Sequence, residues 1–207
     1  MPTRRSWVQV PSPAPNMLQN FITNIFQKYI SKRDINYFKN NFFYFIFFRL
    51  VRNFLNSDII INIYDFCVFA SNKRNKTSHA LIHKCGFDDK KEIELIRNIS
   101  KKNKIFFVDC GSNFGFYSLF VASLSKQNLV KSFEPSINTV KDFKKNIKLN
   151  NFSNIEVKNL AISNLHDEKI NFFESENDWE SSVTHSNFKE KSNEIVYSTT
   201  IDNEFKN

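Results

Sequence analysis

The chain has 207 residues, enough to bury one hydrophobic core with at most a small appendage, and its formal net charge is +8. The positive charge lies near the N-terminus: residues 1–60 hold eight Lys/Arg against two Asp/Glu, whereas residues 61–207 hold 21 against 19. An enzyme that acts on nucleic acid usually carries a basic footprint around its catalytic domain. The nearly neutral remainder therefore argues against a nucleic-acid substrate.

Residues 1–16 contain four of the five prolines and no periodic pattern, which indicates a disordered leader. The string WVQVPSPAPN resembles the translated end of a transfer-RNA gene, so Met17 is the hypothetical true start. No apolar segment of a signal peptide follows the basic start MPTRRSW. The longest uncharged apolar run, FFYFIFF, is far shorter than the about 20 residues that a membrane-spanning helix needs.

Between residues 17 and 57, apolar side chains recur at three- and four-residue steps, which predicts an amphipathic helical region. Its expected role is to pack on the domain behind it. The stretch 42–55 combines aromatic residues with arginines, so peripheral contact with a membrane surface is an alternative interpretation. A membrane-associated interaction protein is accordingly a second class of function to test.

From residue 58 onward, apolar and β-branched runs alternate with segments of helical spacing. DIIINIYDFCVFASN predicts one or two short strands. DDKKEIELIRNIS predicts a helix that starts near Asp88 or Asp89, where a carboxylate suits the helix dipole. KIFFVDC then predicts a strand, and its continuous apolar run is typical of burial on both faces.

The same alternation continues beyond that strand. A glycine turn, a helix over Phe116–Leu124 and the strand LVKSFEP follow in order. SINTVKDFKKNIKLNN predicts a helix with Ser136 as its N-cap, and NIEVKNLAIS predicts another strand. Strands that alternate with helices imply an α/β fold with a parallel sheet and right-handed crossovers, the doubly wound, Rossmann-like class.

Two of the three glycines lie four residues apart, directly behind the strand KIFFVDC. Gly111 can adopt backbone angles closed to other residues, as a sharp turn into a helix requires. Gly115 has no side chain, so a ligand or the strand can approach the start of the helix. Asn113 is among the residues that best tolerate a positive φ. Because ligands of open parallel sheets bind at the carboxyl ends of the strands, the turn predicts a binding site.

A second clue is Glu134, which ends the next strand and can accept hydrogen bonds from both hydroxyls of a ribose. The dinucleotide fingerprint G-x-G-x-x-G would need glycine where the chain has Asn113 and Phe116, and the G-K-S/T ending of a P-loop is missing. The spacing D-x-G-x-x-x-G fits the turn that holds S-adenosylmethionine. A nucleotide- or nicotinamide-binding module with the same fold stays as the alternative.

Four ordered motifs extend this match: VDCGSNFGFYSLF, SFEPSINTVKDFKKNIKLNN, NIEVKNLAIS and TTIDNEF. Through them, roughly residues 58–205 resemble the FkbM family of S-adenosylmethionine-dependent methyltransferases. The chain departs from the family pattern at Ser112, where Ala is usual, and at Asp88, where Glu is frequent. The resemblance implies methyl transfer to a hydroxyl oxygen of a small molecule, polyketide or saccharide, with residues 58–207 forming the N-terminal part of the methyltransferase domain.

The resemblance also implies roles for individual residues. Glu134 would bind the ribose hydroxyls, Pro135 and Ser136 would flank the adenine, and Leu160 and Ala161 would lie over its other face. Another group would line the methionine side of the cofactor: Asp109, Gly111, Ser112, Asn113, Gly115 and Tyr117. Taken singly, Asp109 is equally consistent with a cap of the following helix, and Tyr117 with the core.

A general base for the acceptor hydroxyl stays unassigned. Asp178, Glu180 and His185 in ENDWESSVTH are candidates, but a solvated loop is the favoured interpretation of that stretch. In the family, the segment resembled by TTIDNEF precedes a K-x-D-x-E-G strand that pairs with the first strand. We therefore expect KIFFVDC to be an exposed apolar edge and the chain to be a fragment or a frameshifted product, with an inactive fragment as one alternative.

The cysteines and histidines give no sign of a metal site. Cys67, Cys85 and Cys110 show neither a C-x-x-C nor a His-linked spacing, which argues against a disulfide framework and against zinc. We expect them to be small buried residues in a reducing compartment, which predicts a cytoplasmic protein. His79 and His83 are four residues apart, but no H-E-x-x-H pattern surrounds them.

Overall fold

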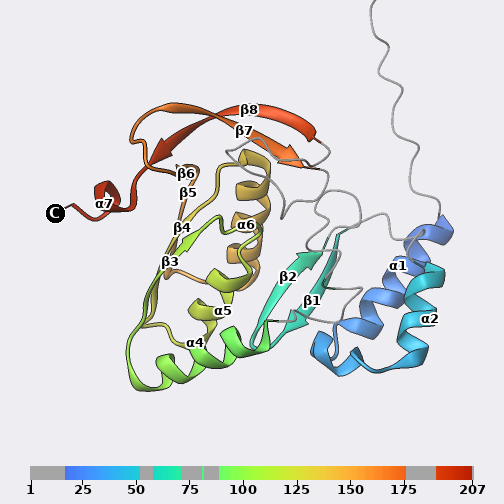
Figure 1. Cartoon of the computed structure of the whole chain (residues 1–207). Helices are drawn as coiled ribbons and strands as arrows, with labels where there is room; N and C mark the ends of the chain where they lie inside the picture. Colours follow the sequence, from blue (N-terminus) through green and yellow to red (C-terminus); the bar gives the residue numbers. More distant parts are fainter. Residues whose placement is uncertain (1–16, 52–57, 71–80, 82–88, 176–189, 207) are drawn as a thin grey trace, which may run out of the picture.

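The computed structural model describes residues 17–51, 58–70, 81, 89–175 and 190–206. The sequence predictions for residues 1–16, for His79, His83 and Cys85, and for the candidate bases at 178, 180 and 185 lie outside these ranges. The described elements form successive layers: a parallel sheet, the helices α5 and α6, a β-hairpin, and the helices α1 and α2 (Figure 1).

The parallel sheet has the order β3-β4-β5, with β3 at Phe106–Cys110, β4 at Leu129–Phe133 and β5 at Ile155–Lys158. The crossover helices are α5 (Phe116–Leu124) and α6 (Ile137–Leu149), and α4 (Lys90–Lys102) precedes β3. This alternation confirms the predicted α/β class as an incomplete Rossmann-like fold, and α5 has the predicted bounds. The predicted cap of α6 is also confirmed, since the Ser136 hydroxyl accepts a hydrogen bond from the Thr139 N–H at 3.4 Å.

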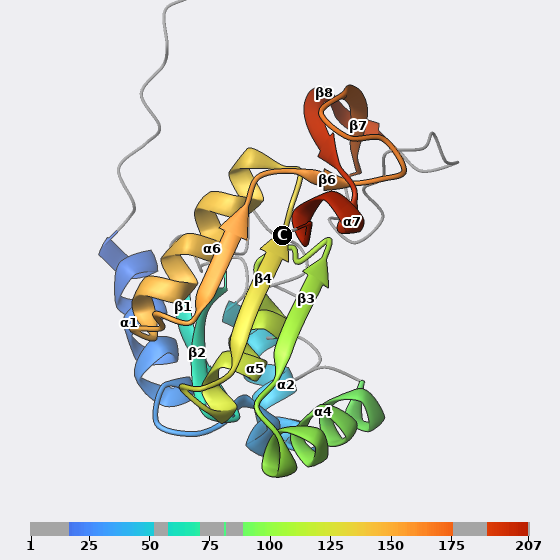
Figure 2. The same ribbon diagram turned by 90° about the vertical axis from the view of Figure 1, so that its left-hand side faces the viewer.

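The prediction that the strand KIFFVDC, which is β3, is buried on both faces is wrong. Every residue of β3 is exposed or half-buried, and Phe106 is 55% exposed. Among the described residues β3 is one of the two edge strands of the parallel sheet, which confirms the expected apolar edge. The face that carries Phe106 and Leu129 has no covering helix in the described chain except α7 (Ile201–Glu204), whereas α5 and α6 lie on the other face (Figure 2).

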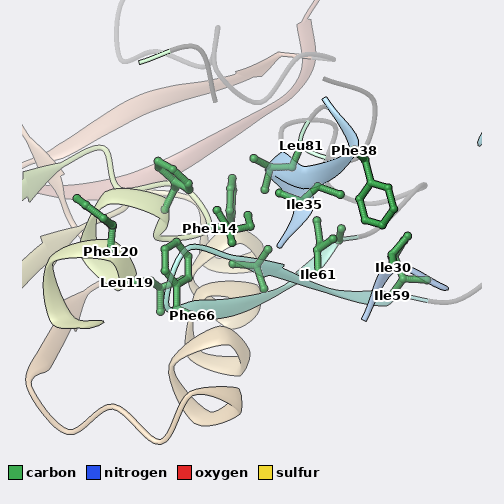
Figure 3. Close-up of a cluster of buried hydrophobic side chains, with 14 of the residues drawn as sticks. Ile30, Ile35, Phe38, Ile59, Ile61, Phe66, Leu81, Phe114, Leu119 and Phe120 are labelled. Atoms are coloured by element: carbon green, nitrogen blue, oxygen red, sulfur yellow. The ribbon is translucent and has the colours of Figure 1, made fainter. Parts of the chain in front are cut away.

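A β-hairpin forms the centre of the core. Its strands β1 (Ile59–Ile63) and β2 (Phe66–Ala70) are antiparallel, and alternate side chains of both are buried. Figure 3 shows Ile59, Ile61 and Phe66 of this hairpin between two groups of apolar side chains. Ile30, Ile35 and Phe38 come from α1 (Met17–Ile30) and the 3-10 helix η1 (Ile35–Phe38), and Phe114, Leu119 and Phe120 come from the turn before α5 and from α5 itself.

Asn146 of α6 and Asn150, the C-cap residue of this helix, bind the backbone of β2. The Asn150 side chain accepts a hydrogen bond from the Cys67 N–H and donates one to the Cys67 carbonyl, both at 2.7 Å. One helical turn earlier, Asn146 accepts from the Phe69 N–H at 2.8 Å and donates to the Phe114 carbonyl at 3.1 Å. The side-chain amides therefore pair with β2 as a neighbouring strand would, which satisfies backbone groups that would otherwise be buried without partners.

The predicted strand NIEVKNLAIS is split between two sheets. Its second part, β6 (Ala161–Ile162), pairs in parallel with β8 (Glu190–Thr199), and β8 pairs antiparallel with β7 (Lys169–Ser175). The break falls at Asn159, whose amide donates hydrogen bonds to the carbonyls of Glu134 and Pro135. Figure 2 shows this second sheet and α7 beyond the carboxyl ends of β3 and β4.

Candidate functional site

The glycine turn between β3 and α5 has a left-handed backbone at three of its positions. The φ angles are +80° at Gly111, +50° at Asn113 and +92° at Gly115, so the prediction that Asn113 tolerates a positive φ is confirmed. The N–H groups of Gly111 and Ser112 both donate to the Phe133 carbonyl, at 2.9 and 3.0 Å. These bonds fix the turn to the end of the neighbouring strand β4.

Glu134, which follows β4, points toward this turn. Its side chain is buried, with 6% of the residue exposed. One carboxylate oxygen accepts a hydrogen bond from the Asn113 N–H and the other from the Ser136 N–H, each at 2.9 Å. The structure thus brings the acidic strand end, the glycine turn and the start of α6 together at the carboxyl edge of the sheet, where open parallel sheets bind ligands.

The two glycines serve different purposes. A Cβ atom built on Gly111 would meet no atom of the described residues within 4 Å, so this part of the turn borders open space among them. A Cβ on Gly115 would lie 2.0 Å from Cε2 of Phe143, a ring of α6 that is fully buried. The Phe143 ring therefore occupies the space that a side chain at position 115 would need, and the close approach of a ligand to Gly115 stays a prediction. Ser112, between them, is buried, and its Oγ has no hydrogen-bond partner among the described residues.

Asp109 is engaged with α5. Its carboxylate accepts a hydrogen bond from the Ser118 hydroxyl at 2.5 Å, and the Ser118 and Ser132 hydroxyls are 2.8 Å apart. Burial raises the pKa of Asp109, and the hydrogen bonds from the side chain and backbone of Ser118 oppose this shift. These contacts match the alternative in which Asp109 holds the start of the following helix.

Tyr117 is half-buried and also contacts an acid outside the turn. Its hydroxyl donates to Asp89, the N-cap residue of α4, at 2.6 Å. Burial raises the pKa of Tyr117, and the hydrogen bond to Asp89 adds to the effect. Among the residues expected to surround the adenine, Ser136 caps α6, and the Pro135 carbonyl accepts from Asn159 at 2.7 Å. Leu160 is half-buried, and Ala161 packs against Phe172 and Val196 of the second sheet.

The sequence did not reveal several residues that shape this site. The Ser118 hydroxyl donates to Asp109 and also bonds with the Ser132 hydroxyl of β4. The Asn159 amide donates to the Glu134 carbonyl. Each of Ser118, Ser132 and Asn159 lies inside a quoted motif, but no spacing rule distinguishes it from an ordinary polar residue. The cysteine expectation is wrong for the two described cysteines, because Cys110 is exposed at the end of the edge strand and Cys67 is half-buried.

A separate cleft of about 500 Å³ contains none of the candidate residues. It is lined by Lys39, Asn40, Tyr64, Lys90, Ile93, Glu94 and Arg97. Within the described ranges, no group of three or more His, Cys, Asp or Glu side chains is arranged to hold a metal ion. Nor does any helix in that part of the chain have the length and hydropathy needed to cross a bilayer.

Comparison with protein-family models gives no match, and comparison with curated proteins gives none either. Among solved structures, a SAM-dependent methyltransferase from Agrobacterium tumefaciens is 14% identical over 52% of this chain and 33% of that chain, with a TM-score of 0.41. A tRNA (uracil-54, C5)-methyltransferase from Pyrococcus abyssi is 17% identical over 50% of this chain and 24% of that chain, with a TM-score of 0.35.

A third solved structure, coclaurine N-methyltransferase bound to N-methylheliamine and SAH, is 14% identical over 77% of this chain and 41% of that chain, with a TM-score of 0.35. The chain therefore spans less than half the length of each of these three proteins. At these identities and TM-scores the likenesses assign no activity. An assignment has to come from the residues at the carboxyl edge of the sheet.

Proposed function

We propose that the carboxyl edge of β3 and β4 binds S-adenosylmethionine, and that the chain carries the cofactor-binding elements of a methyltransferase related to the FkbM family. The observation that carries this proposal is the position of Glu134. A buried carboxylate at the end of β4 is held beside the glycine turn by the N–H groups of Asn113 and Ser136. An acidic side chain at this place can accept hydrogen bonds from the hydroxyls of a ribose.

Two further features support a ligand at the turn. The backbone at Gly111 is exposed and borders open space, so a ligand can approach it closely. Within the described part of the chain the buried Ser112 Oγ has no hydrogen-bond partner, and an unsatisfied buried hydroxyl is uncommon unless a ligand or water binds it. Asp109 is bonded to Ser118, so we assign it to shaping the turn, not to contact with the methionine part.

When bound, S-adenosylmethionine would supply a methyl group on a sulfonium, whose neutral thioether is a good leaving group. The chain's own residues must hold the nucleoside through Glu134 and the turn, and keep the acceptor oxygen in line. Following the family resemblance, we propose a hydroxyl of a small molecule, polyketide or saccharide as the acceptor. The candidates for its base at 178, 180 and 185 lie outside the described residues, so no base is assigned.

Isothermal titration of the full chain with three ligands tests the proposal. We expect S-adenosylmethionine and S-adenosylhomocysteine to bind and NAD not to bind. Glu134→Gln removes the charge and places an NH₂ group opposite one of the two N–H donors, so affinity should fall about tenfold or more. The matched control is Glu156→Gln on β5, whose side chain is 61% exposed, and it should leave affinity unchanged.

Tight binding of NAD would favour the nucleotide-binding alternative and overturn the methyl-donor assignment. The same holds if Glu134→Gln, shown to be folded by its thermal transition, binds S-adenosylmethionine as well as the parent chain does. A chain that folds cooperatively but binds neither adenosyl ligand would also refute the proposal.

A further inference from the structure

The helix α1 has a second apolar stripe that packing on the hairpin does not use. Its residues Thr23, Phe26 and Ile30 are buried toward the core. At 3.6 residues per turn, four exposed apolar residues fall within about a quarter of the circumference on another side. They are Leu18, Phe21, Ile25 and Tyr29, with exposed fractions of 55%, 61%, 46% and 43%.

The neighbouring helix α2 (Phe42–Val51) extends this stripe. Phe42, Phe43 and Ile46 are 70%, 79% and 43% exposed. The two stripes meet where the Tyr29 ring lies 6.0 Å from the ring of Phe47, one helical turn beyond Phe43. Figure 1 shows α1 and α2 side by side at the edge of the molecule away from the parallel sheet. We call Leu18, Phe21, Ile25, Tyr29, Phe42, Phe43 and Ile46 the N-terminal apolar surface.

The charges beside this surface have one sign. Lys28, Lys32 and Arg33 are exposed at and just beyond the end of α1. The Arg33 guanidinium lies 4.1 Å from the centre of the exposed Tyr37 ring. Asp34, the acid of this region, is half-buried and accepts a hydrogen bond from the Tyr64 N–H. The exposed charges of the described residues 17–48 are therefore all positive.

We propose that the N-terminal apolar surface docks on a lipid membrane with anionic headgroups. Contiguous exposed apolar patches of this kind mark interaction sites on soluble proteins. Exposed Phe and Tyr side chains with adjacent Lys and Arg are the composition of helices that lie in a membrane interface. Helices of 14 and 10 residues are too short to span a bilayer, so they would lie along its surface.

A second copy of the chain is a weaker occupant for the same surface. A second copy would offer Lys28, Lys32 and Arg33 only its own cations, since the described residues 17–48 hold no exposed acid, and such a surface does not complement itself in charge. Anionic headgroups complement these cations. The hairpin and the layer of α5 and α6 separate α1 and α2 from the parallel sheet (Figure 1), so membrane docking leaves the candidate ligand site uncovered.

Cosedimentation of the full chain with sucrose-loaded vesicles tests the proposal. We expect binding to vesicles of phosphatidylcholine with one quarter phosphatidylserine, and weaker binding to phosphatidylcholine alone. Phe21→Ser with Phe43→Ser should lower the partition coefficient about tenfold or more, because two exposed rings no longer enter the interface. The matched control is Ile195→Ser with Tyr197→Ser on β8, at 70% and 50% exposure, which should change nothing.

The charge is tested in a second arm. Lys28→Gln with Lys32→Gln should weaken binding to the anionic vesicles about tenfold, and added salt should do the same. Lys101→Gln with Lys102→Gln, two exposed residues at the end of α4, is the matched control. Thermal unfolding by circular dichroism verifies that every variant folds, as expected for exposed positions.

Three outcomes would overturn the proposal. The parent chain does not sediment with anionic vesicles, or Phe21→Ser with Phe43→Ser binds as well as the parent, or the β8 control loses as much binding. Light scattering adds a fourth: if the parent chain is a dimer that becomes monomeric in Phe21→Ser with Phe43→Ser, the surface is covered by a second copy and not by lipid.

Discussion

A methyl group at Gly115 provides a direct test of how the glycine turn is held. Gly115→Ala must keep a φ of +92°, which costs a residue with a Cβ about 1–2 kcal/mol. The new Cβ would also lie 2.0 Å from the Phe143 ring, and overpacking of a well-packed core costs about 1–3 kcal/mol. We expect a loss of about 2–5 kcal/mol in the free energy of unfolding, a large part of the 5–15 kcal/mol that stabilises a typical domain.

Gly111→Ala is the matched comparison. Its φ of +80° carries the same backbone penalty, but the described residues place no atom within 4 Å of the new methyl group, so we expect a loss of only about 1–2 kcal/mol. Urea denaturation followed by circular dichroism measures both variants. In a Phe143→Ala background the cost of Gly115→Ala should fall to that of Gly111→Ala, because the clash is gone. Equal losses for the two glycine variants, or no coupling to Phe143, would refute this account of the turn.

Two further predictions concern polar contacts. Burial disfavours the charged form of Glu204, but hydrogen bonds from Lys158 and Lys131 outweigh it and lower its pKa from 4.5 to about 2. This stabilisation should therefore be present above pH 4.5 and disappear as the pH falls toward 2, a dependence that Glu204→Gln should remove from thermal midpoints measured across that range. Tyr117→Phe removes the hydroxyl that donates to Asp89 and should lower the free energy of unfolding by about 1.5 kcal/mol in urea denaturation.

The part of the fold that the sequence predicted is the part that local periodicity determines. The strands and helices from KIFFVDC to α6 follow because each has its own apolar spacing, and the start of α6 is also marked by its cap Ser136. The second sheet was not anticipated, because β6 has only two residues and pairs Ala161 with Ser198, far along the chain. A pairing between such distant segments leaves no periodic signal in either of them.

The candidate site divides in the same way. The positive φ of Asn113 and the approach of Glu134 to the turn follow from residue type and from the rule that parallel strands end at one edge. The reason for Gly115 could not be found locally, since the ring that requires a glycine there belongs to α6. Likewise, the partner of Asp109 is Ser118, one of many serines that no spacing rule singles out.

These contacts make α6 the element on which the site depends. At its start, the Ser136 N–H binds Glu134; in its middle, Phe143 covers Gly115; and Asn146 binds both the turn at Phe114 and the strand β2 at Phe69. The hairpin in turn carries α1, whose Gln27 side chain accepts from the Ile60 N–H and donates to the Ile60 carbonyl. A displacement of α6 would thus move the acid, the glycine turn and the hairpin together. The geometry at the carboxyl edge is therefore set by the packing of this helix as much as by the turn itself.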